Sequence, residues 1–558
     1  MSRLKPSLFI LRSLAISSAL LLSFTSNAAS TYVPPTCFDP FAKPLYPANL
    51  GKTTITSSAE SARFLNMATF GPNTRDIDHL SKMTMQQWLD EQFAMNASCH
   101  LAALNQTQNN NDRNNRIAVW FKHAVTAPDQ LRQRVAFALS EIFVVSDVGS
   151  GIPTNALAVY YDILVKNAFG NFRDLLEKVT LSPAMGRYLS MLGNQRSNRQ
   201  LGIRADENYA REIMQLFTIG LNELDATGVP MLQNGELIPT YEQAEVEALA
   251  RVFTGWSWGN SYNFTDGDDW RISMKPFVNY HDRLSKTIVG QALIPAGNRA
   301  DKDLALALDT LFNHPNVGPF IGRRLIQRLV TSNPSPEYVG RVAAKFNDNG
   351  KGVRGDMQAV IQAILLDTEA LTGTRANRNF GKLREPLLVV THLWRALNAS
   401  TGEGNFTYYS PEAKIGQAPQ SAPSVFNFFK PDYAPTGIMT KNKLVAPEFQ
   451  LVNEANNTHF FNELFGLIQW SANTNPNADK RNILININTL TKKAKAPADL
   501  INYLDLIFMN RKMPTEMQTV LLAYLRNVPL GSNDQRGVAR SLDALYLVMT
   551  SPYYLIQR

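Results

Sequence analysis

The sequence predicts a mainly α-helical protein, one large body of many helices with small β-hairpin insertions near 228–239 and 256–294. Apolar residues recur at helical spacing along most of the chain after residue 57. Capping residues, glycines and prolines mark where many of these segments begin and end. No tandem repeat and no shift in composition divides residues 57–558. We therefore expect these residues to form a single large helical domain, in one or two lobes.

Residues 1–28 have the features of a signal peptide. Positive residues flank an apolar run over 14–24, and Ser26-Asn27-Ala28 has small residues at the positions that signal peptidase accepts. The run is too short for a permanent anchor, and no later segment approaches about 18 uninterrupted apolar residues. The lack of an Arg-Arg pair favours general secretion. We expect a periplasmic or secreted product with no transmembrane segment after cleavage; an uncleaved N-terminal anchor is the alternative.

A proline-rich leader follows the signal peptide. Five prolines in residues 29–56 disfavour regular structure, so this segment is expected to be irregular. The chain has two cysteines, Cys37 in the leader and Cys99 beyond it. In an oxidising compartment an even count suggests one disulfide, which would tie the leader to the first helices. Two buried free thiols are the alternative, and two distant cysteines do not suffice for a tetrahedral zinc site.

The charge of the chain argues against nucleic-acid binding. The formal net charge is +8, and it falls to +5 when the three basic residues of the signal peptide are removed. Spread over the remaining chain, this charge gives a weakly basic surface rather than a nucleic-acid footprint. No nucleic-acid partner is therefore expected.

The helical pattern begins at Ser57, which forms a capping box with Glu60, and it first stops at Gly71-Pro72. A second capping box, at Thr84 and Gln87, begins the next helix. Further helices in this half are expected at 131–145 and 157–165.

The centre of the chain adds strands to the helices. Residues 228–239 alternate around Asn234-Gly235, a strong two-residue hairpin signal. A helix is then expected from Thr240 to Val252. Residues 256–294 lack a helical period, and a second short hairpin is expected around Gly290.

Helices dominate the second half, at 302–313, 317–330, 336–347, 355–367 and 384–397. Residues 398–447 form instead a loop of about 50 residues, rich in proline, glycine, serine and aromatic residues. A loop of that length in a compact domain is usually functional or wrapped over a surface. The last helices are expected at about 449–470, 498–509, 515–527 and 535–550.

The helix predicted over 207–219 carries paired polar residues beside its apolar stripe. Glu207 and Arg211 are four residues apart, as are Asn208 and Glu212, so the pairs occupy neighbouring strips of the helix. One interpretation is a solvated, salt-bridged face. The other is one wall of a polar cleft, in which Glu207 or Glu212 acts as an acid/base or ligand and Arg211 binds an anion.

A second candidate group is His281-Asp282 with Lys286, in the loop that follows. A neutral histidine can shuttle a proton or bind a metal, and an aspartate can tune it; a hydrogen-bonded structural histidine is the alternative. Trp256 belongs to an aromatic group around this loop, which suits either ligand stacking or core packing. No known hydrolase, metalloprotease or phosphate-binding motif accompanies these residues, so metal and cofactor remain unspecified.

Three charged residues of the second half are further binding candidates: Arg324, Arg384 and Glu385. Buried Arg–Glu pairing between helices would explain them, and anion binding is the alternative.

Many of these segments together resemble the bacterial exported family catalogued as domain of unknown function 1800. The resemblance runs in order from about residue 59 to the C-terminus. It implies a mostly helical exported protein and an exported partner, encoded nearby, that looks sulfatase- or phosphatase-like; it implies no catalytic residue or cofactor. The motifs are Ala62-Arg63-Phe64-Leu65, Ala68-Thr69-Phe70-Gly71-Pro72, Glu207-Asn208-Tyr209-Ala210-Arg211-Glu212, Phe253-Thr254-Gly255-Trp256, His281-Asp282 with Lys286, Phe312-Asn313-His314-Pro315, Arg323-Arg324-Leu325, Leu383-Arg384-Glu385-Pro386 and Pro423-Ser424-Val425-Phe426-Asn427-Phe428-Phe429.

Two hypotheses about function remain open. The first is an envelope or cell-surface binding and assembly protein that acts with an exported partner. The long loop, the aromatic-rich centre and the lack of an assembled catalytic motif favour it. The second is a hydrolase-like periplasmic enzyme, whose polar cleft is built from the 207–212 helix and the 281–286 loop. The second requires the candidate side chains to converge within hydrogen-bond reach.

Overall fold

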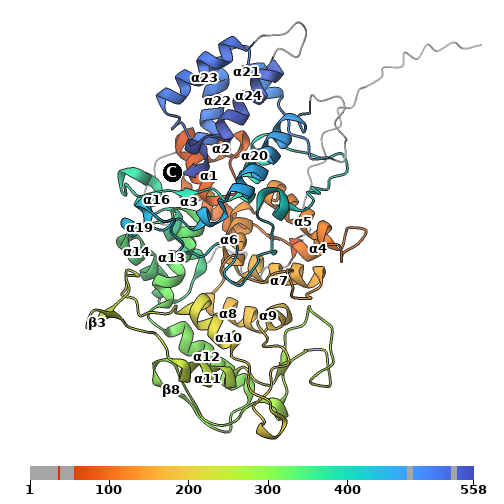
Figure 1. Ribbon diagram of the computed structural model, residues 1–558, viewed down its shortest axis with the longest axis vertical. Coiled ribbons are helices and arrows are strands. Elements are labelled where there is room, and N and C mark those ends of the chain that lie inside the picture. Colours follow the sequence, from red (N-terminus) through yellow and green to blue (C-terminus); the bar gives the residue numbers. More distant parts are fainter. Residues whose placement is uncertain (1–35, 38–55, 474–481, 529–536) are drawn as a thin grey trace, which may run out of the picture. The chain divides into compact units, whose positions relative to one another are not determined.

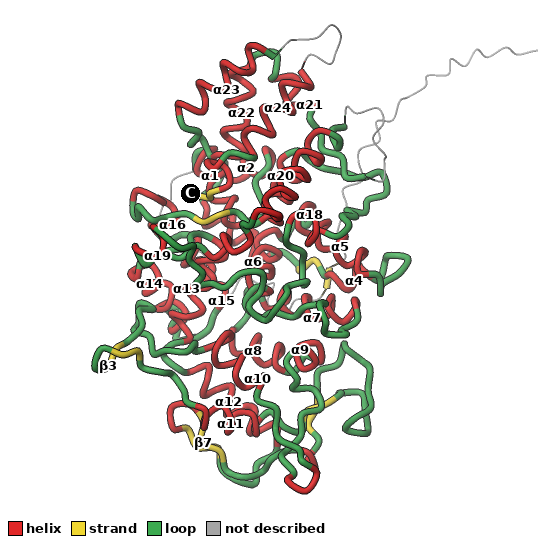
Figure 2. Tube along the Cα trace, in the orientation of Figure 1, coloured by secondary structure: helices red, strands yellow, loops and turns green. Residues whose placement is uncertain are grey.

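Helices dominate the protein, and its strands are two or three residues long (Figure 2). The computed structural model describes residues 36–37, 56–473, 482–528 and 537–558. The predicted signal peptide and nearly all of the predicted leader lie outside these ranges. Within them, the mainly α-helical prediction is confirmed, and so are the hairpins near 228–239 and 256–294.

The first helices surround α6, which contacts α1, α3, α5 and α7. The capping boxes predicted at Ser57 and Thr84 both form and begin α1 and α3. Helix α6 is buried along nearly its whole length, polar residues included. It ends at Ser140, five residues before the predicted end, so Glu141 caps a buried helix instead of lying within it. The helices are α1 (Ser58–Ala68), α2 (Thr74–Leu80), α3 (Met85–Ala94), α4 (His100–Leu104), α5 (Arg113–Thr126), α6 (Gln130–Ser140), α7 (Thr154–Asn167), α8 (Phe172–Thr180) and α9 (Pro183–Tyr188).

The helix predicted over 207–219 is two segments. An α-helix, α10 (Asn208–Glu212), continues into a π-helix over Ile213–Thr218. The backbone N–H of Ile219 donates to the carbonyl of Met214, five residues back, at 3.0 Å. Gly220 ends the segment with a φ of 74°, and a Cβ at this position would lie 2.8 Å from the ring of Phe320. Glycine is therefore required here by both backbone conformation and space.

The middle and second half follow the predicted order of helices. Helices α13, α14 and α15 pack in succession, while α12 packs against α8 (Figure 1). The helices are α11 (Gln243–Val252), α12 (Ala300–Asn313), α13 (Val317–Leu329), α14 (Pro336–Asn347), α15 (Met357–Leu365), α16 (Thr368–Thr372) and α17 (Pro386–Ala396). Short 3-10 turns lie at Arg199–Leu201, Val278–Tyr280, Val289–Gln291, Gly373–Arg375 and Pro447–Leu451.

The long loop over 398–447 contains two short helices that the sequence did not predict, α18 (Pro411–Ile415) and α19 (Ile438–Lys441). The last helices are α20 (Glu454–Gln469), α21 (Asn488–Lys493), α22 (Pro497–Met509), α23 (Thr515–Asn527), α24 (Val538–Met549) and α25 (Pro552–Leu555). Helices α22, α23 and α24 contact one another and lie side by side, in blue in Figure 1.

All sheets among the described residues are antiparallel strand pairs. Two of them join distant parts of the chain, β1 with β2 and β9 with β10. Cys37 pairs with Ala97 along the backbone, two residues before the buried Cys99, but the Cys37 side chain is outside the described residues and the disulfide stays a prediction. The pairs are β1 (Thr36–Cys37) with β2 (Ala97–Ser98), β3 (Leu232–Gln233) with β4 (Glu236–Leu237), β5 (Trp256–Ser257) with β6 (Lys275–Pro276), β7 (Lys286–Ile288) with β8 (Ala292–Ile294), and β9 (Lys382–Leu383) with β10 (Ile556–Gln557).

One large apolar cluster runs from Ala62 to Tyr554, and a small satellite lies around Leu104. The described residues belong to one compact unit, 34–558. No described helix is both long enough and apolar enough to cross a membrane.

Candidate functional site

Each of the two predicted groups of polar residues contacts a different end of α11. In the first group, Arg211 Nη2 lies 3.2 Å from Glu207 Oε2, and the side chain of Gln243 in α11 donates to the same oxygen at 2.9 Å. In the second group, Asp282 Oδ1 accepts from Nη2 of Arg251 in α11 at 3.0 Å. Gln243 and Arg251 are eight residues apart in α11, which corresponds to about 12 Å along the helix axis. The structure does not bring the two groups into one cleft.

The His281 side chain is buried and fully engaged. Its Nδ1 lies 2.9 Å from the carbonyl oxygen of Thr254, and its Nε2 lies 3.1 Å from Asp303 Oδ2. Both ring nitrogens therefore face acceptor oxygens, and neither is open to a metal or a substrate. A Cβ on Gly255, whose φ is 81°, would lie 2.7 Å from the backbone nitrogen of His281. Glycine at this position therefore lets the backbone at 255 approach the backbone at 281.

Lys286 completes a closed network around Asp303. The buried Nζ donates to Asp303 Oδ2 at 2.7 Å and to the carbonyl oxygens of Asp282 and Leu284, at 2.7 and 2.9 Å. All three ammonium protons are thus used. Burial acts to raise the pKa of Asp303, but hydrogen bonds from His281 and Lys286 lower it below its ordinary value. This network ties the 281–286 loop to α12 as a structural ion-pair cluster.

The remaining candidates near this site, in the 207–212 segment and at Trp256, differ in how far they are exposed. Asn208 is exposed. Glu212 is only 8% exposed, and its Oε2 has no hydrogen-bond partner among the described residues. Burial raises the pKa of Glu212, against a lowering effect of Arg211. Trp256 is buried in the core, where it packs rather than faces solvent. Within this motif, Glu212 is therefore a buried acid with one carboxyl oxygen unpaired among the described residues.

Arg384 and Arg324 each make contacts within the protein. Arg384 donates to the Tyr554 carbonyl oxygen at 2.8 Å and to Asn66 Oδ1 at 3.1 Å. Its guanidinium also lies over the Tyr554 ring, at 4.9 Å from the centroid. These contacts give Arg384 a structural role. Arg324 lies half-buried on α13, with the Phe320 ring beneath its guanidinium.

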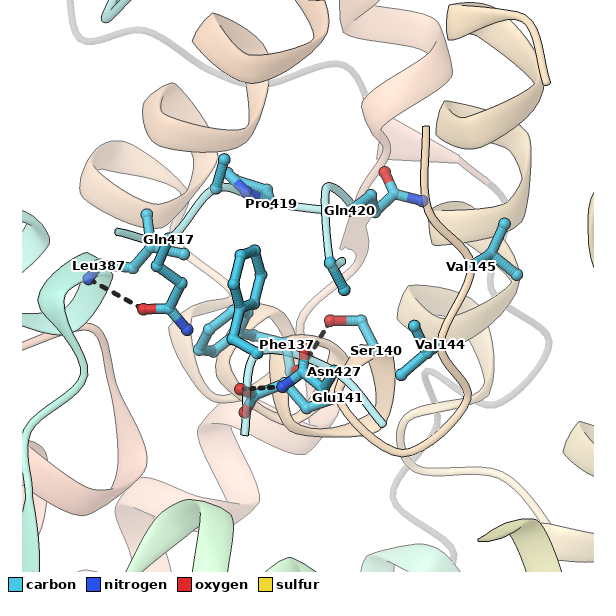
Figure 3. A pocket seen from close by; sticks show the side chains of 13 residues that line it. Phe137, Ser140, Glu141, Val144, Val145, Leu387, Gln417, Pro419, Gln420 and Asn427 are labelled. Atoms are coloured by element: carbon cyan, nitrogen blue, oxygen red, sulfur yellow. Dashed lines mark hydrogen bonds between the residues drawn. The ribbon is translucent and has the colours of Figure 1, made fainter. Parts of the chain in front are cut away.

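Glu385 belongs to a buried carboxyl pair that the sequence did not reveal. It caps the start of α17, while its partner Glu141 caps the end of α6. The two carboxyl groups lie close enough for each to shift the pKa of the other. Two amides from the long loop hold one oxygen of each. Gln417 Nε2 donates to Glu385 Oε2 at 2.7 Å. Asn427 Nδ2 donates to Glu141 Oε1 at 3.0 Å (Figure 3).

Buried cations surround this pair. Lys382 Nζ lies 3.6 Å from Glu385 Oε1, and 3.0 Å from Glu448 Oε1. Arg328 Nε lies 3.8 Å from Glu141 Oε2, and the positive charge of Arg134 acts on both carboxyl groups.

The surroundings act in opposite directions on the two carboxyl groups. Burial and the neighbouring Glu385 raise the pKa of Glu141 well above its ordinary value. Burial acts in the same direction on Glu385, but the charge of Lys382 lowers the pKa of Glu385. These effects favour the protonated form of Glu141 and the charged form of Glu385, whose charge balances the cations.

A narrow pocket of about 280 Å³ lies beside Glu141 and beneath the loop segment 417–428 (Figure 3). Little of it is wide enough for more than a water molecule. The amides of Gln417 and Asn427 already occupy the two carboxyl groups on its side. This arrangement fixes the long loop onto α6 and α17. Asn427 lies within one of the motifs that carry the family resemblance, whereas Glu141 and Gln417 carry no local signal.

A different surface is formed by α23, α24 and α25. It is a groove that is open to solvent. Its walls include exposed apolar side chains, of which Val520 is 68% exposed, and its acidic residues are Glu516 and Asp543. The groove is lined by Glu516, Met517, Val520, Leu521, Tyr524, Asp543, Tyr546, Leu547, Ser551, Pro552 and Tyr553.

Exposed aromatic side chains of α20 continue the groove. Phe465 lies 5.5 Å from the ring of Tyr546 in the groove wall, and 6.2 Å from the ring of Trp470. Trp470 is 69% exposed. Contiguous exposed apolar surface of this kind is typical of a protein-binding site.

Comparison with known proteins gives one match. The family model described as protein of unknown function DUF1800 matches residues 63–556. No curated protein and no solved structure matches the chain. The family match confirms the resemblance inferred from the motifs.

Proposed function

Because the chain belongs to the DUF1800 family of proteins of unknown function, we propose a function from its own surface. The protein is an exported binding and assembly protein of the periplasm or cell surface, and it acts on an envelope component together with an exported partner. The groove of α23, α24 and α25 is the surface that binds the partner. This groove is the observation that carries the proposal.

The composition of the groove supports protein binding. Protein interfaces are enriched in Tyr, Trp, Phe and Met, and the groove offers Tyr524, Tyr546, Tyr553 and Met517, with Trp470 beyond its end. Tyrosine and tryptophan side chains bury much area at a small cost in conformational entropy, and methionine adapts its shape to a partner surface. An exposed apolar surface is costly to keep in water unless a partner covers it.

The charge of the groove restricts the partner. Its ionisable acids are Glu516 and Asp543, and Tyr524 Oη donates to Asp543 Oδ2 at 3.0 Å. A partner segment with an apolar face and basic flanking residues complements this surface. The sulfatase- or phosphatase-like exported protein implied by the family resemblance is the first partner to test.

Export is supported by the sequence. The pattern of residues 1–28 is that of a cleaved signal peptide for general secretion. Cell fractionation of the native protein, with N-terminal sequencing, tests this part. Recovery in the periplasm or medium with a new N-terminus after residue 28 is expected, and an intact N-terminus in the cytoplasm would contradict it.

The partner-binding part is tested by affinity capture from envelope extract, with the mature protein tagged at its N-terminus. We expect wild type to retain a stable partner and Val520→Asp to lose it, because a charge at the centre of the groove must then be desolvated. Ile438→Asp is the matched control, since Ile438 is 78% exposed on α19, outside the groove. Equal recovery by Val520→Asp, or repeated failure of wild type to retain any partner, would contradict the proposal.

A further inference from the structure

Helix α13 carries three arginines whose guanidinium groups differ in how many partners they contact within the protein. Arg328 lies over the Phe429 ring, 4.5 Å from its centroid, and close to the carboxyl pair. Arg324 makes one hydrogen bond, from Nη1 to Gln327 Oε1 at 3.3 Å, and lies over the Phe320 ring at 4.9 Å. Arg323 makes no hydrogen bond or ion pair with the residues that the structure describes. Both Arg323 and Arg324 are half-buried.

The positive charge of this pair is not compensated by a bonded carboxylate. Burial lowers the pKa of Arg323. Burial, together with the charges of Arg323 and Arg328, lowers the pKa of Arg324 to about 9, while Asp432 acts to raise it. Asp432 is exposed and forms no ion pair with either arginine among the described residues. A half-buried cation without a partner is costly, and an anion bound from solution offsets that cost.

We propose that Arg323 and Arg324 form a binding site for a tetrahedral oxyanion, a sulfate or phosphate group. Guanidinium groups present pairs of N–H donors that match the oxygens of such groups. Phe320 and Gln327 hold the Arg324 guanidinium in place, so little conformational freedom is lost when an anion binds it. The Arg323 side chain, which has no bonded partner to give up, provides the second set of donors.

The end of the long loop borders this site. The Gln327 side chain donates to the carbonyl oxygen of Pro431 at 3.2 Å, which places Asp432 next to the arginines. Its carboxylate repels an anion at the site. Replacing Asp432 with asparagine should therefore strengthen anion binding, while replacing either arginine with alanine should weaken it.

The test is calorimetric titration of the mature protein with sodium sulfate and sodium phosphate at pH 7, with ionic strength held constant by chloride. Arg323→Ala and Arg324→Ala are each expected to weaken binding at least about tenfold, the loss that accompanies removal of one charge-assisted hydrogen-bonding group. Arg324→Lys should also weaken it, because an ammonium group lacks the planar pair of donors. Asp432→Asn should tighten it.

Arg299→Ala serves as the control, because Arg299 is an exposed arginine paired with Asp301 elsewhere on the surface. Its affinity for both anions should equal that of wild type. Glucose 6-sulfate and glucose 6-phosphate, titrated in parallel, distinguish an esterified group from the inorganic ion. The proposal is overturned if wild type shows no saturable binding of any of the four ligands, or if the double variant Arg323→Ala/Arg324→Ala binds them as wild type does. It does not depend on the partner-binding function.

Discussion

The buried carboxyl pair makes a sharp prediction, because the same substitution should cost little stability at one member and much at the other. Glu141→Gln replaces an acid whose surroundings favour its neutral form with a neutral amide, whose oxygen still accepts from Asn427. We expect its cost to be within about 1 kcal/mol of unfolding free energy. Glu385→Gln instead removes the negative charge that faces Lys382 and leaves a buried cation undercompensated. Its expected cost is about 3–5 kcal/mol.

The dependence of stability on pH gives a second test of which carboxyl group is neutral. Glu141 has a raised pKa in the folded protein, against about 4.3 in an unfolded chain. The folded state therefore holds one more proton between these two pH values, and this group makes stability fall as pH rises through that window. The contribution to the slope is at most about 1.4 kcal/mol per pH unit. Glu141→Gln should abolish it.

Urea unfolding followed by circular dichroism from pH 5 to pH 8.5 measures both effects. We expect the stability of Glu141→Gln relative to wild type to increase with pH, and Glu385→Gln to be destabilised throughout. A large loss in Glu141→Gln together with a mild effect of Glu385→Gln would show that Glu385 is the neutral member of the pair. Equal losses in both would refute the assignment of the neutral form to Glu141.

Three further substitutions test other parts of the structure. Asp303→Asn leaves two buried basic groups without their carboxylate and should cost about 3–5 kcal/mol in urea unfolding, whereas the exposed Asp301→Asn should cost less than about 1 kcal/mol; equal costs would contradict the ion-pair role. Gly220→Ala adds a Cβ that would lie 2.8 Å from the Phe320 ring at a φ of 74°. Thermal melting should show a loss of about 1–3 kcal/mol in the free energy of unfolding, and an unchanged melting temperature would be inconsistent with this packing. Glu212→Gln removes a buried acid of raised pKa, so its stability relative to wild type should rise between pH 5 and pH 8; a pH-independent difference would mean that Glu212 is ionised normally.

The sequence predicted features that depend on neighbouring residues. The capping boxes at Ser57 and Thr84 and the hairpin around Asn234-Gly235 involve residues at most a few positions apart, and each is present. The turn from α-helix to π-helix after Glu212 was not predictable, because the apolar stripe suits both.

The chemistry of the candidate residues depended on partners far away in the chain. His281 and Asp282 are adjacent, but the ring of His281 bonds Asp303, a residue that no sequence motif singled out. Glu385 was identified as a candidate, whereas its partner Glu141 follows an ordinary apolar helix. Local periodicity cannot report such pairings, since they are set by how the helices pack.

The strand pair β9–β10 has a consequence for how the protein can be made. Residues 556–557 pair with 382–383, just before Arg384-Glu385, and the Gln557 side chain donates to the Leu329 carbonyl oxygen at 3.0 Å. This strand pair beside the carboxyl groups therefore cannot form until residues 556–557 have been synthesised. A chain that lacks this closing contact during most of its synthesis remains available for threading through a secretion channel. The order of assembly and the proposed route of export are in this way compatible.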